Sequence, residues 1–249
     1  MKYGLLGGKL GHSYSPIIHN YVFEKLNIKA SYDLIECNED ELSFYINELR
    51  NGNYSGFNVT IPYKKTIMNL LDLIDDKALK IGSVNTIYFK DNKVIGTNTD
   101  YDGFLKTLKY YNVEVLNKDC YVLGTGGASL SVSEVLKDLG GHVTFVSRTP
   151  KENIISYNDL EDKSIDILVN TTPVGMYPNT DGCPVSESVI KKSDVVIDII
   201  FNPKTTKLLE YANSNINGLY MLVMQALKAE EIWQNRSIDI DVNELLTRM

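Results

Sequence analysis

A glycine turn that joins a short apolar run to a helical pattern is the feature that most restricts how this chain can fold. The turn has the sequence Gly124-Thr125-Gly126-Gly127-Ala128-Ser129. Residues 120–124 predict a buried strand and residues 128–139 predict a helix, which is the strand-turn-helix context of a dinucleotide site. In such a site glycine permits the tight turn, and N–H groups at the positive end of the helix face a pyrophosphate. Ser129 stands where the third glycine is expected, and glycine turns also occur as ordinary connections.

The next predicted strand indicates which dinucleotide such a site prefers. Residues 142–147 have the β-branched and aromatic content of a second parallel strand, which ends at Arg148-Thr149. An NAD site usually has an acid here for the ribose 2′-OH, whereas this chain has Ser147 and Arg148, and an arginine can pair with a 2′-phosphate. With Thr149 and Lys151 nearby, the pattern favours NADP. The alternative is that Arg148 is merely a solvated cation at the end of a strand.

Apolar runs of strand length alternate with amphipathic segments of helix length, and this alternation predicts an α/β fold. Strands are predicted near residues 2–6, 30–36, 56–59, 87–90, 121, 143, 165–170 and 194–198. Helices are predicted near residues 16–26, 39–51, 66–71, 128–139 and 221–235. The later strands suit a doubly wound, Rossmann-like nucleotide domain that begins shortly after Asp100.

Composition narrows the class of protein. The 249 residues carry a formal net charge of −7, which argues against a partner with a phosphate backbone, so no nucleic acid is expected. The cysteines Cys37, Cys120 and Cys183 lack metal-ligand spacing, so we expect reduced thiols, no metal and a cytoplasmic setting. The N-terminal apolar run is too short for a signal peptide, and no later run approaches the ~18 apolar residues of a membrane span.

Two polar clusters ahead of the glycine turn supply a candidate proton-transfer pair. Lys64 ends the first cluster, residues 58–64, and Asp100 ends the second, residues 98–100. Each also has a simpler explanation, since Lys64 and Lys65 could be an exposed pair and Asp100 could be the N-cap of a helix over residues 101–110.

Other polar residues leave similar alternatives. Ser13 and Ser15 before Pro16 fit a helix start. Asn85 fits a turn, and Gln225 lies within an apolar stripe, where its amide needs a partner. For His12 and His19 we favour structural roles, because no third ligand or partner lies nearby in the sequence.

Eight short motifs occur in order along nearly the whole chain. The first half contains the segments 11–20 (GHSYSPIIHN), 56–64 (GFNVTIPYK), 82–86 (GSVNT) and 96–103 (GTNTDYDG). The second half contains the turn 124–129, the strand end 148–149, and the segments 170–176 (NTTPVGM) and 218–226 (GLYMLVMQA). Taken in this order, the motifs resemble those of the shikimate dehydrogenase family. Each motif is moderately specific, but eight in the family's order are improbable by chance.

The resemblance implies reversible NADPH-dependent reduction of 3-dehydroshikimate to shikimate, in aromatic amino-acid (chorismate) biosynthesis. It implies that Lys64 and Asp100 are catalytic, and that the substrate-binding residues are Ser13, Ser15, Thr60, Asn85, Gln225 and Phe201. It implies NADP contacts from Gly124, Thr125, Gly126, Gly127, Ala128, Ser129, Ser147, Arg148, Thr149, Lys151, Thr172, Ile199, Gly218 and Asp76. The implied organisation is an α/β substrate domain, residues 1–100 completed by residues 218–249, and a Rossmann-like NADP domain, residues 101–217. A homodimer is left open.

The sequence departs from the family pattern at a few of these positions. Phe201 stands where a tyrosine is usual, Tyr220 where glycine is common, Asp76 where glutamate is more common, and Ser147 where asparagine is usual. The lost tyrosine hydroxyl would weaken substrate binding by about 1 kcal/mol. Two alternatives follow: a quinate/shikimate dehydrogenase with relaxed use of NAD and NADP, or a catalytically idle nucleotide-binding regulator with the same fold.

Overall fold

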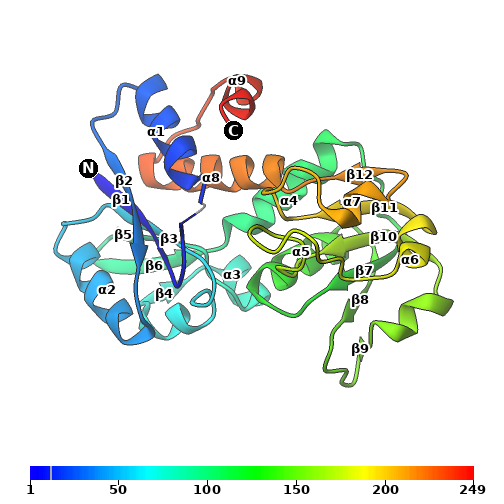
Figure 1. The fold of residues 1–249 in the computed structure, drawn as a ribbon. Helices are drawn as coiled ribbons and strands as arrows, with labels where there is room; N and C mark the ends of the chain where they lie inside the picture. Colours follow the sequence, from blue (N-terminus) through cyan, green and yellow to red (C-terminus); the bar gives the residue numbers. More distant parts are fainter. Residues whose placement is uncertain (12) are drawn as a thin grey trace. The chain divides into compact units, whose positions relative to one another are not determined.

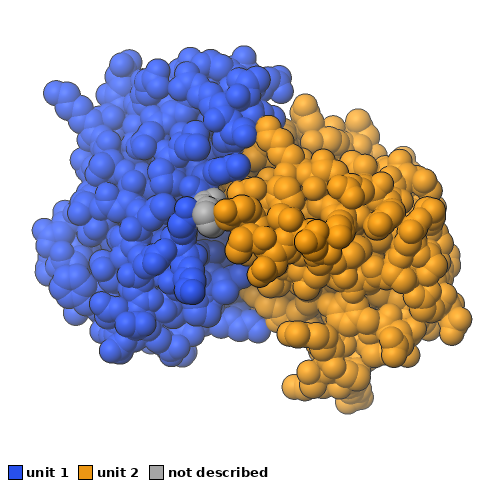
Figure 2. Space-filling model, in the orientation of Figure 1, with its two compact units in different colours: residues 1–103, 223–249 blue, residues 104–222 orange. Residues whose placement is uncertain are grey.

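The computed structural model describes residues 1–11 and 13–249 and divides the chain into two compact units (Figures 1 and 2). Unit 1 comprises residues 1–103 and 223–249, and unit 2 comprises residues 104–222. His12, for which the sequence favours a structural role, lies outside the described residues. The substrate and NADP domains inferred from sequence, 1–100 with 218–249 and 101–217, stay a prediction about function.

Unit 1 contains a mixed sheet whose order over the described residues is β2-β1-β3-β5-β6-β4. Its strands are β1 (Lys2–Gly7), β2 (Ser31–Glu36), β3 (Gly56–Val59), β4 (Leu73–Ile74), β5 (Thr86–Lys90) and β6 (Lys93–Thr97). β1 pairs in parallel with β2 and β3, whereas β5 is antiparallel to both β3 and β6. This arrangement brings the residues that follow β1, β3 and β6 to the same edge of the sheet.

Several helices belong wholly or partly to unit 1 (Figure 1). They are α1 (Ser15–Lys25), α2 (Leu42–Arg50), α3 (Asp76–Ile81), α4 (Thr99–Tyr110), α8 (Leu219–Gln234) and α9 (Val242–Thr247), with 3-10 helices η1 (Glu39–Glu41) and η2 (Thr66–Leu70). The chain passes between the units within α4 and within α8. The helix predicted near residues 66–71 is therefore a 3-10 helix.

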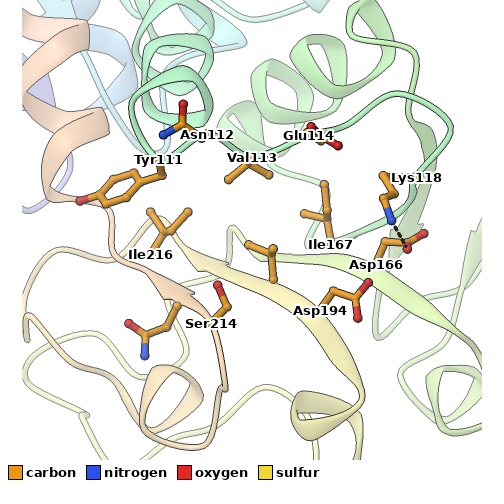
Figure 3. Close-up of a pocket in the computed structure, with 12 residues that line it drawn as sticks. Tyr111, Asn112, Val113, Glu114, Lys118, Asp166, Ile167, Asp194, Ser214 and Ile216 are labelled. Atoms are coloured by element: carbon orange, nitrogen blue, oxygen red, sulfur yellow. Dashed lines mark hydrogen bonds and ion pairs between the residues drawn. The ribbon is translucent and has the colours of Figure 1, made fainter.

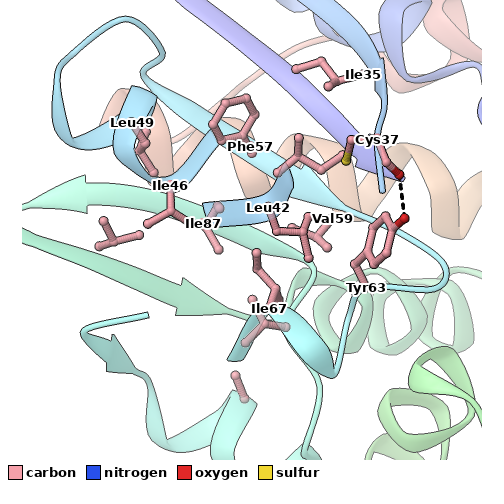
Figure 4. Close-up of a cluster of buried hydrophobic side chains, with 14 residues drawn as sticks. Ile35, Cys37, Leu42, Ile46, Leu49, Phe57, Val59, Tyr63, Ile67 and Ile87 are labelled. Carbon is pink, nitrogen blue, oxygen red and sulfur yellow. Dashed lines mark hydrogen bonds between the residues drawn. The ribbon is translucent and has the colours of Figure 1, made fainter. Parts of the chain in front are cut away.

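Apolar side chains from both faces of the unit 1 sheet form its core. On one face, α2 and η2 pack through Leu42, Ile46 and Ile67 against Phe57 and Ile87 of the sheet (Figure 4). On the other face, the ring of Trp233 in α8 stacks on Tyr3 of β1 with ring centroids 4.7 Å apart. Burial of each such side chain stabilises the fold by about 1.5–3 kcal/mol relative to leaving it in water.

Unit 2 contains a sheet whose order over its residues is β12-β11-β10-β7-β8-β9, and its strand pairings are parallel. The strands are β7 (Asp119–Leu123), β8 (His142–Val146), β9 (Ile154–Ile155), β10 (Ile165–Asn170), β11 (Ser193–Asp198) and β12 (Asn215–Ile216). The helices are α5 (Gly127–Asp138), η3 (Asn158–Asp162), α6 (Glu187–Lys191) and α7 (Lys207–Glu210). Counted from β9, this is the doubly wound order 3-2-1-4-5-6, so the predicted Rossmann-like α/β fold is confirmed.

Candidate active site and dinucleotide site

A largely buried lysine–carboxylate pair lies beyond the end of β3 in unit 1. The Nζ atom of Lys64 is 2.5 Å from Oδ2 of Asp100, and the two side chains are 13% and 9% exposed. The Lys64 carbonyl accepts a hydrogen bond from the Val84 amide at 2.8 Å, which holds the backbone at this position. Only Lys65 is exposed, so the alternative of an exposed Lys64–Lys65 pair is wrong. The structure brings the predicted proton-transfer pair together, and its catalytic role stays a prediction.

Asp100 is the second residue of α4 and does not cap it. Asn98 Oδ1 accepts a hydrogen bond from the Tyr101 amide at 3.2 Å, which is the bond that an N-cap makes. The alternative in which Asp100 is the cap is therefore wrong. Its carboxylate instead accepts a hydrogen bond from Asn85 Nδ2 at 2.9 Å, and the positive end of α4 stabilises its negative charge.

Asn85 and Gln225 complete a polar cluster around this pair. Asn85 is 3% exposed, and its Oδ1 accepts a hydrogen bond from the Thr99 amide at 2.7 Å. Gln225, from α8, lies with Oε1 at 3.4 Å from Thr99 Oγ1, which supplies the partner that its amide needs. Thr60 is half-buried directly after β3, with its amide bonded to the Leu6 carbonyl at 2.9 Å. The cluster thus gathers polar groups from four separate segments of unit 1.

The two serines of the N-terminal loop bond to each other at the start of α1. The Ser15 amide donates to Ser13 Oγ at 3.2 Å, and Ser13 Oγ donates to Ser15 Oγ at 3.1 Å. Pro16 occupies the first turn of α1, as expected for a helix start, but the N-cap residue, Tyr14, makes no side-chain capping bond. The loop is also tied to β2, because the Leu10 amide donates to Glu36 Oε1 at 2.7 Å.

In unit 2, the glycine turn joins β7 to α5 as predicted. Gly124 has φ +105°, a conformation that favours glycine. Ser129 is fully buried, and its Oγ accepts a hydrogen bond from the Gly126 amide at 3.1 Å and lies 2.6 Å from Thr171 Oγ1. Thr171 Oγ1 in turn donates to the Leu123 carbonyl at 2.5 Å. Ser129, which stands where the third glycine of the dinucleotide motif is expected, therefore links the turn to the ends of β7 and β10 by hydrogen bonds.

The end of β8 presents the residues predicted to choose the dinucleotide. The Ser147 amide bonds to the Ile155 carbonyl at 2.9 Å, and the Thr149 amide bonds to Ser147 Oγ at 3.2 Å. Arg148, Thr149 and Lys151 are exposed. A fixed backbone with two exposed cations after the second strand is compatible with a 2′-phosphate, so the residues fit NADP.

A buried carboxylate at the end of β11 anchors the next loops of this edge. Asp198 accepts hydrogen bonds from Thr206 Oγ1 at 2.7 Å, the Ile200 amide at 3.0 Å and Asn170 Nδ2 at 3.1 Å. Asn170 Oδ1 then accepts from the Thr172 amide at 3.0 Å and from its hydroxyl at 2.7 Å. The sequence analysis did not single out Asn170 and Asp198 as site residues, although polar residues at the carboxyl ends of parallel strands are a usable signal.

Burial raises the pKa of Asp198 to about 6 from an ordinary 3.8, although its hydrogen bonds oppose the shift. Because the folded protein then binds this proton more tightly than the unfolded chain, stability is lost as the pH rises through that interval. Two pKa units correspond to about 3 kcal/mol. We expect the unfolding free energy of the wild type, relative to Asp198→Asn, to fall by about this amount between pH 4 and 7. Urea unfolding of both proteins across this range checks it, and a pH-independent difference would contradict it.

The remaining predicted residues occupy different places. Gly218 directly precedes α8, and its amide donates to the Ile200 carbonyl at 3.0 Å, next to Ile199. Phe201 is half-buried in unit 2, whereas the other predicted substrate residues belong to unit 1. Asp76 is exposed at the start of α3 in unit 1, whereas the other predicted NADP residues belong to unit 2. The roles of Phe201 and Asp76 stay predictions.

A cavity of about 420 Å³ opens elsewhere in unit 2, at the amino-terminal edge of its sheet (Figure 3). Its lining includes Asp166 and Asp194 near the starts of β10 and β11, together with Lys118 and Tyr111. Ligands of doubly wound sheets bind beyond the carboxyl ends of the strands. This cavity is therefore not the dinucleotide site.

The described part of the chain offers neither a metal-binding cluster nor a membrane-spanning helix. Residues 1–11 and 13–249 contain no group of three His, Cys, Asp or Glu side chains arranged to hold a metal ion. Among the helices of these same residues, none is both long enough and apolar enough to cross a membrane.

Together these features define a class of protein. A doubly wound parallel sheet with a glycine turn after its first strand is the architecture of dinucleotide-binding domains. A lysine–carboxylate pair with little exposure, surrounded by amides and hydroxyls, is suited to proton transfer on a polar substrate. The chain is of the class of dinucleotide-dependent oxidoreductases.

Comparisons with known proteins place the chain within this class. Residues 5–87 match the family model described as the shikimate dehydrogenase substrate binding domain. A shikimate dehydrogenase (NADP⁺) of Clostridium perfringens is 44% identical over 97% of this chain and 95% of its own length. The crystal structure of shikimate dehydrogenase 1 from Peptoclostridium difficile has 42% identity and a TM-score of 0.90, covering 99% of this chain and 95% of that one. This chain belongs to the shikimate dehydrogenase family.

A more distant structure shows what a relative binds. The Thermus thermophilus shikimate 5-dehydrogenase, solved in complex with NADP(H) and shikimate, is 27% identical, with a TM-score of 0.89. The match covers 100% of this chain and 99% of that one. The fold is therefore shared from end to end with a protein that holds both molecules.

Proposed function

We propose that this protein catalyses the reversible NADPH-dependent reduction of 3-dehydroshikimate to shikimate, a step of aromatic amino-acid (chorismate) biosynthesis. The observation that carries the proposal is the Lys64–Asp100 pair, 2.5 Å apart and largely buried, in a chain of this family. The hydrogen bond from Asn85 and the start of α4 hold Asp100 in place beside Lys64, and this fixed geometry supports a catalytic role for the pair.

The chemistry requires a group that controls the charge on the substrate oxygen. When hydride adds to the ketone carbon, the electrons of the C=O bond move to oxygen, which must then receive a proton. The Lys64 ammonium is the proposed donor, and in the reverse direction its neutral amine takes the hydroxyl proton. Asp100 orients Lys64 and accepts a hydrogen bond from a neighbouring substrate hydroxyl.

Recognition of the substrate is assigned to the polar groups of unit 1. Asn85, Thr60 and Gln225 hold ring hydroxyls, and Ser13 and Ser15 hold the carboxylate in this proposal. A competitor that lacks one hydroxyl would leave a buried polar group unpaired, which disfavours its binding.

The dinucleotide is assigned to unit 2, where the turn 124–129 with Gly218 and Thr172 would hold NADP. When bound, NADPH supplies the hydride. A side chain built at Gly126 meets nothing within 4 Å, so the backbone at this point of the turn is open to a pyrophosphate. Exposed Arg148 and Lys151 would hold the 2′-phosphate.

The direct test is NADP reduction by the purified protein with shikimate, followed by absorbance of the reduced nicotinamide. Parallel reactions use NAD in place of NADP and quinate in place of shikimate. Turnover confined to shikimate with NADP supports the proposal. Comparable turnover with quinate or NAD would favour the relaxed enzyme, and none with any pair would favour the idle regulator.

Replacing Arg148 with alanine should change the choice of dinucleotide. Loss of a charge-assisted contact with the 2′-phosphate removes about 1.5–3 kcal/mol of NADP binding and nothing from NAD binding. We expect KM for NADP to rise by about 10- to 100-fold while KM for NAD stays unchanged. Lys163→Ala, a change at another exposed cation of unit 2, is the control. Equal rises for both dinucleotides would show that Arg148 does not contact the phosphate.

The setting of the enzyme is a further part of the proposal. We expect it to work in the cytoplasm on a small-molecule substrate, without a nucleic-acid or membrane partner. A homodimer is the open alternative to a monomer.

A further inference from the structure

A buried tyrosine of β2, which the proposed mechanism does not use, is linked through Asn58 to the polar cluster of unit 1. Tyr32 is 7% exposed, and its ring stacks on His19 with centroids 4.0 Å apart and planes 5° apart. His19 Nδ1 is 2.5 Å from Glu230 Oε1, with both side chains fully buried. Burial, followed by the charge of Glu230, raises the pKa of Tyr32 well above 10. The hydroxyl is therefore protonated and can donate at any working pH.

The direction of each hydrogen bond in the cluster follows from Asp100. A carboxylate only accepts, so Asn85 must present Nδ2 to Asp100, and its Oδ1 then accepts from Thr86 Oγ1 at 3.1 Å. Asn58 Nδ2 lies 3.5 Å from the Asn85 backbone carbonyl, which only accepts, and 3.1 Å from Thr86 Oγ1, so this nitrogen donates to both. The orientation of the Asn58 amide is thereby fixed, with Oδ1 on its opposite side.

This orientation determines what Tyr32 does. The Tyr32 hydroxyl lies 2.7 Å from Asn58 Oδ1, and because that oxygen only accepts, Tyr32 must donate. A single directed chain of hydrogen bonds therefore runs from Tyr32 through Asn58, Thr86 and Asn85 to the Asp100 carboxylate.

We propose that Tyr32 is a positioning residue for substrate binding, whose hydroxyl fixes the Asn58 amide, and through it the Asn85 side chain beside Asp100, before the substrate arrives. The inference rests on the proposed function, in which Asn85 holds a ring hydroxyl of the substrate. Side-chain amides that are already ordered lose less conformational freedom when a ligand binds. Tyr32 itself touches neither the substrate nor the dinucleotide in this account.

The test is Tyr32→Phe, which keeps the ring on His19 and removes only the hydroxyl. We expect KM for shikimate to rise about five- to tenfold, with kcat changed less than about twofold and KM for NADP unchanged. In an Asn58→Ala background, which removes the partner of the Tyr32 hydroxyl, the same substitution should raise KM by less than about twofold. Shikimate binding measured by calorimetry should weaken by the same factor as KM rises.

Tyr3→Phe is the matched control. Tyr3 is 1% exposed on the neighbouring strand β1, and its hydroxyl accepts a hydrogen bond from Gln234 Nε2 at 3.1 Å, outside the chain from Tyr32 to Asp100. We expect it to leave KM for shikimate unchanged. An equal rise in Tyr3→Phe, an unchanged KM in Tyr32→Phe, or a full-sized rise in the Asn58→Ala background would each overturn the inference. Inactive wild-type protein would instead overturn the proposed function, and the inference with it.

Discussion

Replacing Lys64 with alanine should lower kcat for shikimate oxidation by about 10²- to 10⁴-fold, the range associated with a lost general acid–base group. Without the lysine, the substrate oxygen has no proton donor in one direction and no base in the other. NADP contacts belong to unit 2 in our proposal, so the dissociation constant for NADPH should stay unchanged. Steady-state rates and a fluorescence titration with NADPH measure the two quantities.

The neighbouring residue provides the control for Lys64→Ala. Lys65 is an exposed lysine one position along the same turn, and Lys65→Ala removes the same charge without touching Asp100. We expect it to keep nearly full kcat. Trp233, the single tryptophan of the chain, packs in the core of unit 1 and reports whether both variants remain folded. Undiminished turnover in a folded Lys64→Ala protein would remove Lys64 from the mechanism.

The longer parallel strands of unit 2, β7, β8, β10 and β11, could be predicted from sequence, whereas the two-residue strands β9 and β12 were not. A strand buried on both faces is a continuous apolar run, which is hard to mistake when polar turns bound it. The strand predicted at 165–170 is β10 (Ile165–Asn170), and the strand predicted at 194–198 lies within β11 (Ser193–Asp198). The glycine turn could also be predicted, because the φ of +105° at Gly124 favours glycine, and glycines are read directly from the sequence.

Short elements of unit 1 were not predicted, for identifiable reasons. β6 (Lys93–Thr97) follows β5 after a two-residue turn, Asp91-Asn92, in which both residues have positive φ, 50° and 64°. That turn contains no glycine, so it lacks the strongest hairpin signal. The helix α9 (Val242–Thr247) is too short to show a helical period, although Asp241 caps it through the Asn243 and Glu244 amides.

The candidate site was predictable only where its residues fall within recognisable motifs. Lys64, Asp100 and Asn85 lie in such motifs, and the structure gathers them. Tyr32 and Glu230 lie in none, because their importance depends on partners far along the chain. Glu230 meets His19 across 211 positions of sequence, a contact that no local pattern can indicate. Positioning residues of this kind become visible only when the fold is known.

Replacing Gly218 with alanine should destabilise unit 2 and abolish NADP binding. A Cβ atom built on Gly218 lies 1.9 Å from the Ile199 carbonyl oxygen and 2.3 Å from its carbon. Neither can move easily, because the Ile199 amide bonds to the Asn170 carbonyl at 3.1 Å and the Gly218 amide bonds to the Ile200 carbonyl at 3.0 Å. Overpacking of this kind lowers the free energy of unfolding by about 1–3 kcal/mol. Because the clash is with backbone atoms rather than with a flexible side chain, we expect a value at the upper end of this range. Urea unfolding followed by far-UV circular dichroism measures the loss.

Gly126→Ala separates the loss of stability from the loss of affinity. Gly126 has φ −80°, which alanine adopts freely, and its added Cβ meets nothing within 4 Å. This variant should unfold at nearly the wild-type urea concentration yet bind NADP more weakly, because the methyl group occupies space left for the pyrophosphate. Gly218→Ala should lose both properties. Ile199 and the start of α8 must move apart to make room for the methyl group, and both Ile199 and Gly218 are predicted to contact NADP. An unchanged unfolding midpoint for Gly218→Ala would show that the close packing of Gly218 against the Ile199 carbonyl does not contribute to the stability of unit 2.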